Sequence, residues 1–151
     1  MIDQLIEAWR TANKAQLLFI DLLPAEAWTA SLSTRGSRNL FEQIAHTHAL
    51  RLQWLEVIDK KLLTGIPRIE KGISPDAQGL HQAIQASGVA IEELIQISWA
   101  NGGKLKGYKK GLIPFITYLI AHEAHHRGHG LLTIKQSGIK IPEGLKWGLW
   151  D

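Results

Sequence analysis

Four of the seven histidines fall within eight residues of the sequence, between His122 and His129. They lie inside an apolar run with helical spacing that extends from Leu112 to Ile134. His122 and His126 are four residues apart, so a helix would place both imidazoles on one face, one turn apart. Two imidazoles in this arrangement can bind the same metal ion. The cluster therefore predicts a metal site that takes its remaining ligands from elsewhere in the chain.

The other two histidines of the cluster, His125 and His129, have the same spacing but point in a different direction from the helix axis. We expect both to lie beside the metal site or at the surface. Because a site with two protein ligands binds a metal weakly, a third ligand is needed. The interior candidates are His46 and His48, which lie in a predicted helix that is apolar on most sides, and periodicity alone favours His48. His81 stands alone and is predicted to be exposed.

The composition indicates one soluble globular domain over residues 1–151, with 45% hydrophobic and 21% charged residues. No apolar run reaches the roughly 18 residues that a membrane span requires, and the first residues do not resemble a signal peptide. We therefore expect a cytoplasmic protein. The net charge of +3 gives little support for a nucleic-acid partner. The chain contains no cysteine, so histidine, carboxylate or water must hold any metal.

The spacing of apolar residues, interrupted by proline and glycine, predicts an all-α protein with four long helices and an irregular tail. Asn39 and Glu42 form a plausible capping box at the start of the second helix. Ser74 precedes Pro75, which suits the first turn of the third helix. Four amphipathic helices favour a four-helix bundle, in which facing helices supply metal ligands. The predicted helices lie near residues 2–23, 39–62, 75–100 and 112–136.

Several segments resemble the DinB/YfiT-like superfamily, and the resemblance extends over nearly the whole chain. The segment 122–128 is similar to the H-x-x-x-H-R-G-Q motif of the fourth helix of that superfamily. His129 stands where the family usually has glutamine. The other residues that carry the resemblance are Leu40, His46, Arg51 and Trp54 in the second predicted helix and Trp147 and Trp150 in the tail.

The resemblance implies an up-down-down-up four-helix bundle, a homodimer and a divalent metal, nickel or zinc in many members, held by three histidines. The positions that match the family pattern are His46, His122 and His126, so the resemblance favours His46 over His48. Some branches of the family also imply a thiol-dependent S-transferase or isomerase, in which the metal binds and activates a low-molecular-weight thiol. Three neutral imidazoles leave an open coordination position and an uncompensated metal charge, and a thiol bound there would lose its proton.

Three other interpretations compete with this one. His122, Glu123 and His126 match H-E-x-x-H, in which the glutamate is the general base of a zinc peptidase. A non-enzymatic bundle that binds metal or takes part in a stress response would carry the same histidines. The histidines could also form a purely structural polar network. Activity toward a thiol separates the enzyme from the binding protein, and metal analysis separates both from the structural interpretation.

Three neighbours of the histidines have two interpretations each. In the three-histidine site, Glu123 is either close to the metal or, as we expect, at the surface one position round the helix. Arg127 either holds a substrate anion or pairs with a carboxylate such as Glu123 or Glu42. Gly128 is predicted to permit the close approach of a neighbouring helix or of the Trp54 ring.

Overall fold

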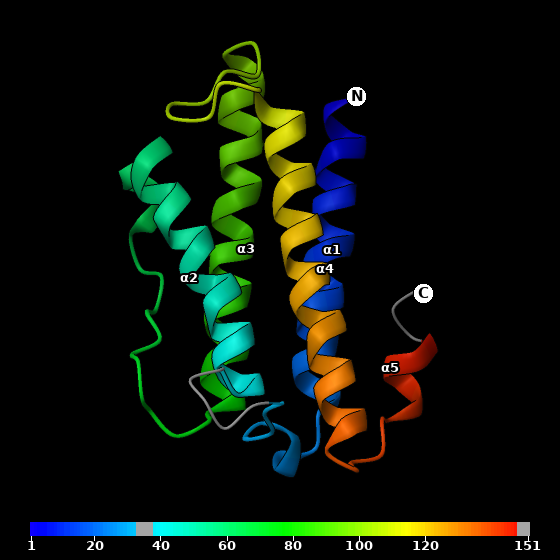
Figure 1. Ribbon diagram of the computed structural model, residues 1–151. Helices are drawn as coiled ribbons and strands as arrows, with labels where there is room; N and C mark the ends of the chain where they lie inside the picture. Colours follow the sequence, from blue (N-terminus) through cyan, green and yellow to red (C-terminus); the bar gives the residue numbers. More distant parts are fainter. Residues whose placement is uncertain (33–37, 148–151) are drawn as a thin grey trace.

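The computed structural model describes residues 1–32 and 38–147, and these residues form an all-α bundle (Figure 1). Two short 3-10 helices, Ala25–Ala27 and Lys60–Leu63, follow the first two long helices. None of the described helices is long and apolar enough to cross a membrane. The α-helices are α1 (Ile2–Leu22), α2 (Leu40–Ile58), α3 (Ala77–Ala100), α4 (Leu112–Gln136) and the short α5 (Glu143–Trp147).

The four long helices have the predicted up-down-down-up order. Figure 1 shows α1 and α4 running in one direction and α2 and α3 in the other. Because α2 and α3 are parallel, the chain between them must return along the length of the bundle. This connection, residues 59–76, passes along the outer side of α2. It thereby covers part of a helix that is apolar on most of its sides.

The start of α2 agrees with the prediction and its end does not. The Asn39 side chain accepts a hydrogen bond of 2.9 Å from the Glu42 backbone N–H, as a capping residue should. The helix stops at Ile58, before the predicted end near residue 62. Asp59 is extended, with φ −154° and ψ 90°, and its carboxylate accepts a hydrogen bond from the Lys61 backbone N–H. This second cap starts a separate 3-10 turn.

The start of α3 and the tail also differ from the prediction. Asp76 caps α3 in place of Ser74, because its carboxylate accepts a hydrogen bond of 3.0 Å from the Gly79 backbone N–H. The tail is not wholly irregular, since it contains α5, and Leu145 of that helix is buried in the core. Trp150 and the Trp147 side chain lie outside the described part of the structure.

The core consists of two apolar clusters with buried polar residues between them. One cluster holds Trp9, Leu55 and Phe115, and the other holds Phe19 and Ile44. Along each long helix a buried polar residue, Gln16, His48, Ser87 or Glu123, lies between the positions that contribute to the two clusters. This middle layer of the bundle contains the buried residues Gln16, Gln43, Thr47, His48, Arg51, Ser87, Glu123 and His126.

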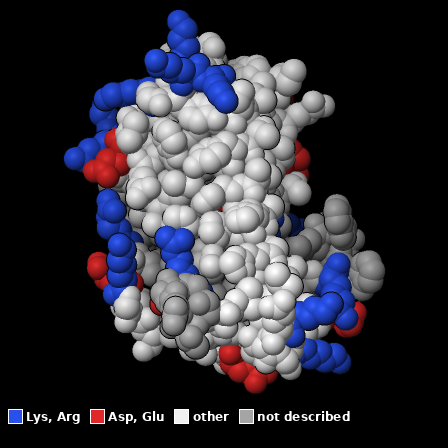
Figure 2. All heavy atoms as spheres, in the orientation of Figure 1, with Lys and Arg blue, Asp and Glu red and all other residues white. Residues whose placement is uncertain are grey.

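Charged residues are distributed unevenly over the surface. Figure 2 shows basic side chains gathered at the end of the bundle formed by the loop between α3 and α4, whereas the middle of the same face carries few charges. The loop contains Lys104, Lys106, Lys109 and Lys110. The positive net charge of the chain is thus partly a property of one end of the bundle.

Candidate metal centre

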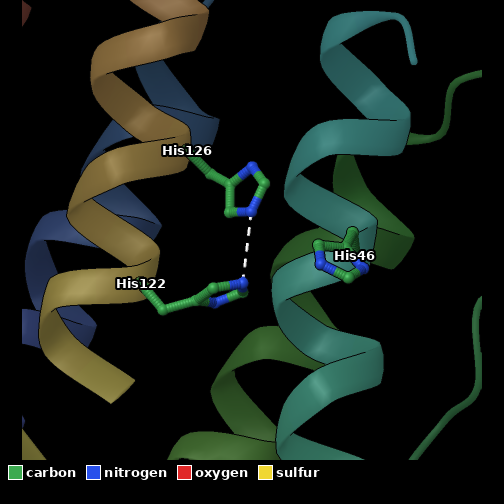
Figure 3. A group of neighbouring side chains, drawn as sticks. All are labelled: His46, His122 and His126. Atoms are coloured by element: carbon green, nitrogen blue, oxygen red, sulfur yellow. Dashed lines mark hydrogen bonds between the residues drawn. The ribbon is translucent and has the colours of Figure 1, made fainter. Parts of the chain in front are cut away.

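His46, His122 and His126 come together at the middle of the bundle, although 76 residues separate the first two in the sequence. One ring nitrogen of each residue lies within 4.8 Å of the others. His122 and His126 project from successive turns of α4, and His46 projects from the facing helix α2 (Figure 3). The centroid of the His46 ring is 5.3 Å from that of His122 and 5.1 Å from that of His126. Two helices thus supply one group of three imidazoles.

The ring nitrogens of α4 are spaced as metal ligands would be. The Nε2 atoms of His122 and His126 are 3.2 Å apart (Figure 3). Two ligands at about 2.0–2.1 Å from a tetrahedral ion lie about 3.3 Å from each other. The Nδ1–H group of His126 donates a hydrogen bond of 2.6 Å to Gln43 Oε1, so the lone pair of this ring is on Nε2. The Nδ1 atom of His122 is buried and has no hydrogen-bond partner among the described residues.

The electrostatics of the group favour neutral rings. Burial lowers the pKa of all three imidazoles, that of His126 to about 4. The positive charge of Arg38 lowers the pKa of each ring further. Since only a neutral imidazole has a lone pair for a metal, these side chains are ready to bind near neutral pH. The spacing of the nitrogens, the tautomer of His126 and the neutral state of the rings therefore fit a divalent ion.

His48, which periodicity favoured as the third ligand, lies away from this group. Its Nδ1 atom is 3.1 Å from Ser87 Oγ, and its Nε2 atom is 2.7 Å from the Pro67 carbonyl oxygen. Both nitrogens therefore have partners within the protein. Burial lowers the pKa of His48 to about 4. Periodicity correctly identified His48 as the more buried of the two residues. Its burial, however, places both ring nitrogens in hydrogen bonds within the core, where they cannot bind a metal.

The remaining histidines lie outside the group. His125 is exposed and His129 is half-buried, which agrees with the expectation that neither shares the face of the ligand pair. His81 is half-buried rather than exposed, and its Nδ1 atom is 2.7 Å from Asp21 Oδ1. These three positions carry no further candidate ligand for the site.

Arg127 pairs with neither of the predicted carboxylates. Its Nη1 atom donates a hydrogen bond of 2.6 Å to Gln16 Oε1, and the Gln16 amide in turn donates to Thr47 Oγ1 over 2.8 Å. This chain of hydrogen bonds joins α4 to α1 and α2. Arg127 therefore supports the packing of the helix that bears the histidines.

Gly128 does not have the predicted packing role, because a Cβ atom there would meet nothing within 4 Å. The close approach occurs instead at Gly130, which faces the opposite way. A Cβ atom at Gly130 would lie 2.6 Å from Leu40 Cδ1 and 3.1 Å from Phe19 Cζ. The need for a small residue belongs to the buried side of α4.

Glu123 is 1% exposed, so the predicted surface position of this residue is wrong. Its two oxygens accept hydrogen bonds from Arg51, from Nε at 2.6 Å and from Nη2 at 3.0 Å. The fully buried Arg51 also donates to the Ile84 carbonyl oxygen and to Ser87 Oγ, and it lies 4.8 Å from the centre of the Trp9 ring. The guanidinium of this α2 residue thus contacts the other three long helices.

The sequence did contain a signal for this ion pair. Arg51 lies in a helix that is apolar on most sides, and a buried guanidinium requires an acceptor. Glu123 is the single carboxylate between positions 112 and 136. The pair could have been predicted from these two facts. Its presence weakens the peptidase interpretation, because both oxygens of Glu123 are engaged by Arg51 and cannot also act as general base.

Comparison with known proteins places the chain in a family. The model of the DinB family matches residues 1–144, and the chain belongs to this family. A crystal structure of a DinB-like protein from Bacillus cereus ATCC 10987 has a similar fold, with a TM-score of 0.67 over 93% of this chain and 95% of that chain. The two sequences are 16% identical, so this likeness concerns the fold alone. A search of curated proteins gave no significant match.

Proposed function

We propose that this protein is a metal-dependent enzyme of the thiol S-transferase type. Its His46, His122 and His126 hold one divalent first-row ion, zinc or nickel. The observation that carries the metal assignment is that three histidines from two helices each place a ring nitrogen within 4.8 Å of the others. Imidazole ligands suit zinc, nickel and copper, so the choice among them depends on supply as well as on affinity. Membership of the DinB family supports the same assignment.

A divalent ion bound by three neutral imidazoles would lower the pKa of a thiol at its open position, which makes that thiol a nucleophile at neutral pH. The protein's own residues prepare this site in two ways. Gln43 holds the proton of His126 on Nδ1, so that Nε2 faces the other rings. The pair of Arg51 and Glu123 fixes α4 against α2, so that His122 and His126 point toward His46.

Metal analysis of single alanine variants tests the site. We expect protein purified without a histidine tag to contain about one equivalent of metal by mass spectrometry. Each of three variants should lose most of this metal, because the two remaining ligands bind it weakly. These variants are His46→Ala, His122→Ala and His126→Ala. His125→Ala, in the same helix but exposed, is the matched control and should keep its metal. Full occupancy in any of the first three variants would contradict the ligand set.

A transfer assay tests the reaction separately. Metal-loaded protein is incubated with a small thiol and an alkylating acceptor, and formation of the thioether is followed against the His46→Ala variant. We expect catalysed transfer that depends on His46. Metal binding without any acceleration over the variant would support the non-enzymatic binding protein instead.

A further inference from the structure

A cavity of about 400 Å³ lies beside His46, between α2 and residues 69–73 of the connection that follows it. This volume is in the range of pockets that bind small molecules. Its walls combine apolar and charged side chains. The lining residues include Phe41, Ala45, His46, Ala49, Ile69 and Ile73, together with the charged Arg38, Glu42, Glu70 and Lys71.

His46 belongs both to this cavity and to the group of three imidazoles. A molecule bound in the cavity would therefore contact one of the three histidines. Another hollow, of about 530 Å³, lies at the far end of the bundle near Trp99, Lys110 and Ile113. It is not lined by any of the histidines. The cavity at His46 is thus the better place for the body of a substrate.

Arg38 is the cavity residue that is best placed to select a ligand. It directly precedes Asn39, the cap of α2, and its side chain is exposed. It forms no ion pair or hydrogen bond with any other residue that the structure describes. Its charge nevertheless lowers the pKa of His46, His122 and His126, so the guanidinium lies within electrostatic reach of all three rings.

The acidic residues of the cavity do not cancel the effect of the Arg38 charge on the pKa values of the three histidines. Glu42 lies one turn from His46 on the same helix, yet neither Glu42 nor Glu70 is among the causes of the shifts in the three ring pKa values. No carboxylate belongs to the histidine group itself. Glu123 raises the pKa of His122, but both of its oxygens are paired with Arg51. A bound divalent ion would add positive charge at the histidines. An anionic ligand is favoured there.

We propose that Arg38 binds the anionic group of a small thiol whose sulfur lies at the three histidines. This group is a carboxylate or its equivalent, and the inference rests on the proposed function. A guanidinium can donate two parallel hydrogen bonds to a carboxylate, which gives direction as well as charge. The apolar wall formed by Phe41, Ala45 and Ile69 would contact the aliphatic part of the same molecule. The substrate class is a low-mass thiol that carries a negative charge.

A pair of thiols that differ in one group tests this proposal. Calorimetric titration of zinc-loaded protein compares 3-mercaptopropionate with 3-mercaptopropionamide, which has nearly the same shape but no charge. We expect the carboxylate to bind about tenfold more tightly, as a charge-assisted hydrogen bond allows. Arg38→Ala should abolish the preference and Arg38→Lys should keep part of it. Lys106→Ala, which removes the same charge from the opposite end of the bundle, should leave the preference intact.

The outcomes separate this inference from the proposed function. Zinc content is measured for every variant, and Arg38→Ala should bind as much zinc as the unmodified protein. Absence of zinc from the unmodified protein would overturn the proposed function and the inference with it. Zinc binding with equal affinity for the two thiols, or a preference that persists in Arg38→Ala, would overturn the inference alone. Arg38→Gln, checked by circular dichroism, repeats the test if the alanine variant does not fold.

Discussion

A single hydrogen bond determines which nitrogen of His126 is free. Gln43 Oε1 accepts from Nδ1 at 2.6 Å, and such partners of a ligating histidine commonly change metal affinity when removed. We expect Gln43→Leu to weaken zinc binding by about 10–100-fold, whereas Gln43→Glu, which retains an acceptor, should not. Competition with a chelating dye measures the affinity. The control is Gln53→Leu, which changes an exposed position on the same helix and should leave the affinity for zinc unchanged. An unchanged affinity in Gln43→Leu would refute the role of the hydrogen bond between Gln43 and His126.

A different histidine makes stability depend on pH. Burial lowers the pKa of His48 in the folded protein from 6.5 to about 4, while in the unfolded chain it returns to about 6.5. The unfolded state therefore binds more protons between these values, and stability falls as the pH is lowered through this window. Between about pH 7.5 and about pH 5 the loss should be about 2 kcal/mol for this group.

Urea unfolding of metal-free protein at the two pH values measures this loss. His48→Gln lacks the titrating group, so its stability should change less with pH than that of the unmodified protein. The histidines of the metal centre are present in both proteins and their contribution cancels. Equal pH dependence in the two proteins would show that His48 does not contribute.

Some residues of the candidate metal site could be predicted from the sequence alone, and others could not. The four-residue spacing of His122 and His126 is a local property of a helix, so their common face was predictable. The choice between His46 and His48 was not, because it depends on which side of α2 faces α4. Periodicity locates buried positions without naming the helix they contact. The family resemblance supplied the missing information.

At the scale of helices, the rotation of α4 about its axis is fixed by the buried pair of Arg51 and Glu123. Glu123 precedes the proposed ligand His126 by three residues, and its contact with Arg51 joins α4 to α2 and α3. Removal of one partner leaves an unpaired buried charge. We expect Arg51→Met or Glu123→Gln to lower the free energy of unfolding by about 3–5 kcal/mol.

A double-mutant cycle in urea completes the test of this pair. The combination Arg51→Met with Glu123→Leu should recover much of the loss, since no unpaired charge remains. The control is the surface pair of Arg10 and Glu92, whose disruption should have little effect because water screens it. Additive losses at Arg51 and Glu123 would mean that the two side chains do not act together.

The helices themselves were largely predictable, and the parts that were not have local causes. Apolar spacing located all four long helices, and the Asn39 cap was readable because its hydrogen bond spans only three residues. The end of α2 differed because Asp59 caps a separate 3-10 turn. The start of α3 differed because Ser74 and Asp76 could each have been the cap. The parallel arrangement of α2 and α3 depends on long-range packing, so no local pattern could show it.

At the scale of the whole molecule, we expect two copies of the chain to associate. Several large apolar side chains are exposed on the described surface, and the middle of the face in Figure 2 carries few charges. Association would remove part of this surface from water. Sedimentation velocity at micromolar concentration should give the mass of a dimer, and a monomer over the whole range would contradict the expectation. The exposed residues include Val57, Val89, Ile97, Trp99, Ile113 and Leu132.

The proposed metal would link the two halves of the bundle, because its ligands come from α2 and α4. An unfolded chain disperses these ligands, so metal binding adds to folding stability. A free metal concentration of about 100 times the dissociation constant contributes about 2.7 kcal/mol. For a domain of this size that raises the Tm by about 5–10 °C.

Differential scanning calorimetry with zinc or with a chelator measures this shift. His46 is half-buried at the edge of a cavity, so His46→Ala should fold without metal and melt close to the metal-free unmodified protein. It should nevertheless lose the increase in Tm on adding zinc, whereas His125→Ala should retain it. If His46→Ala is stabilised by zinc as much as the unmodified protein, then zinc binds through α4 alone. The metal would then not connect the helices that form the site.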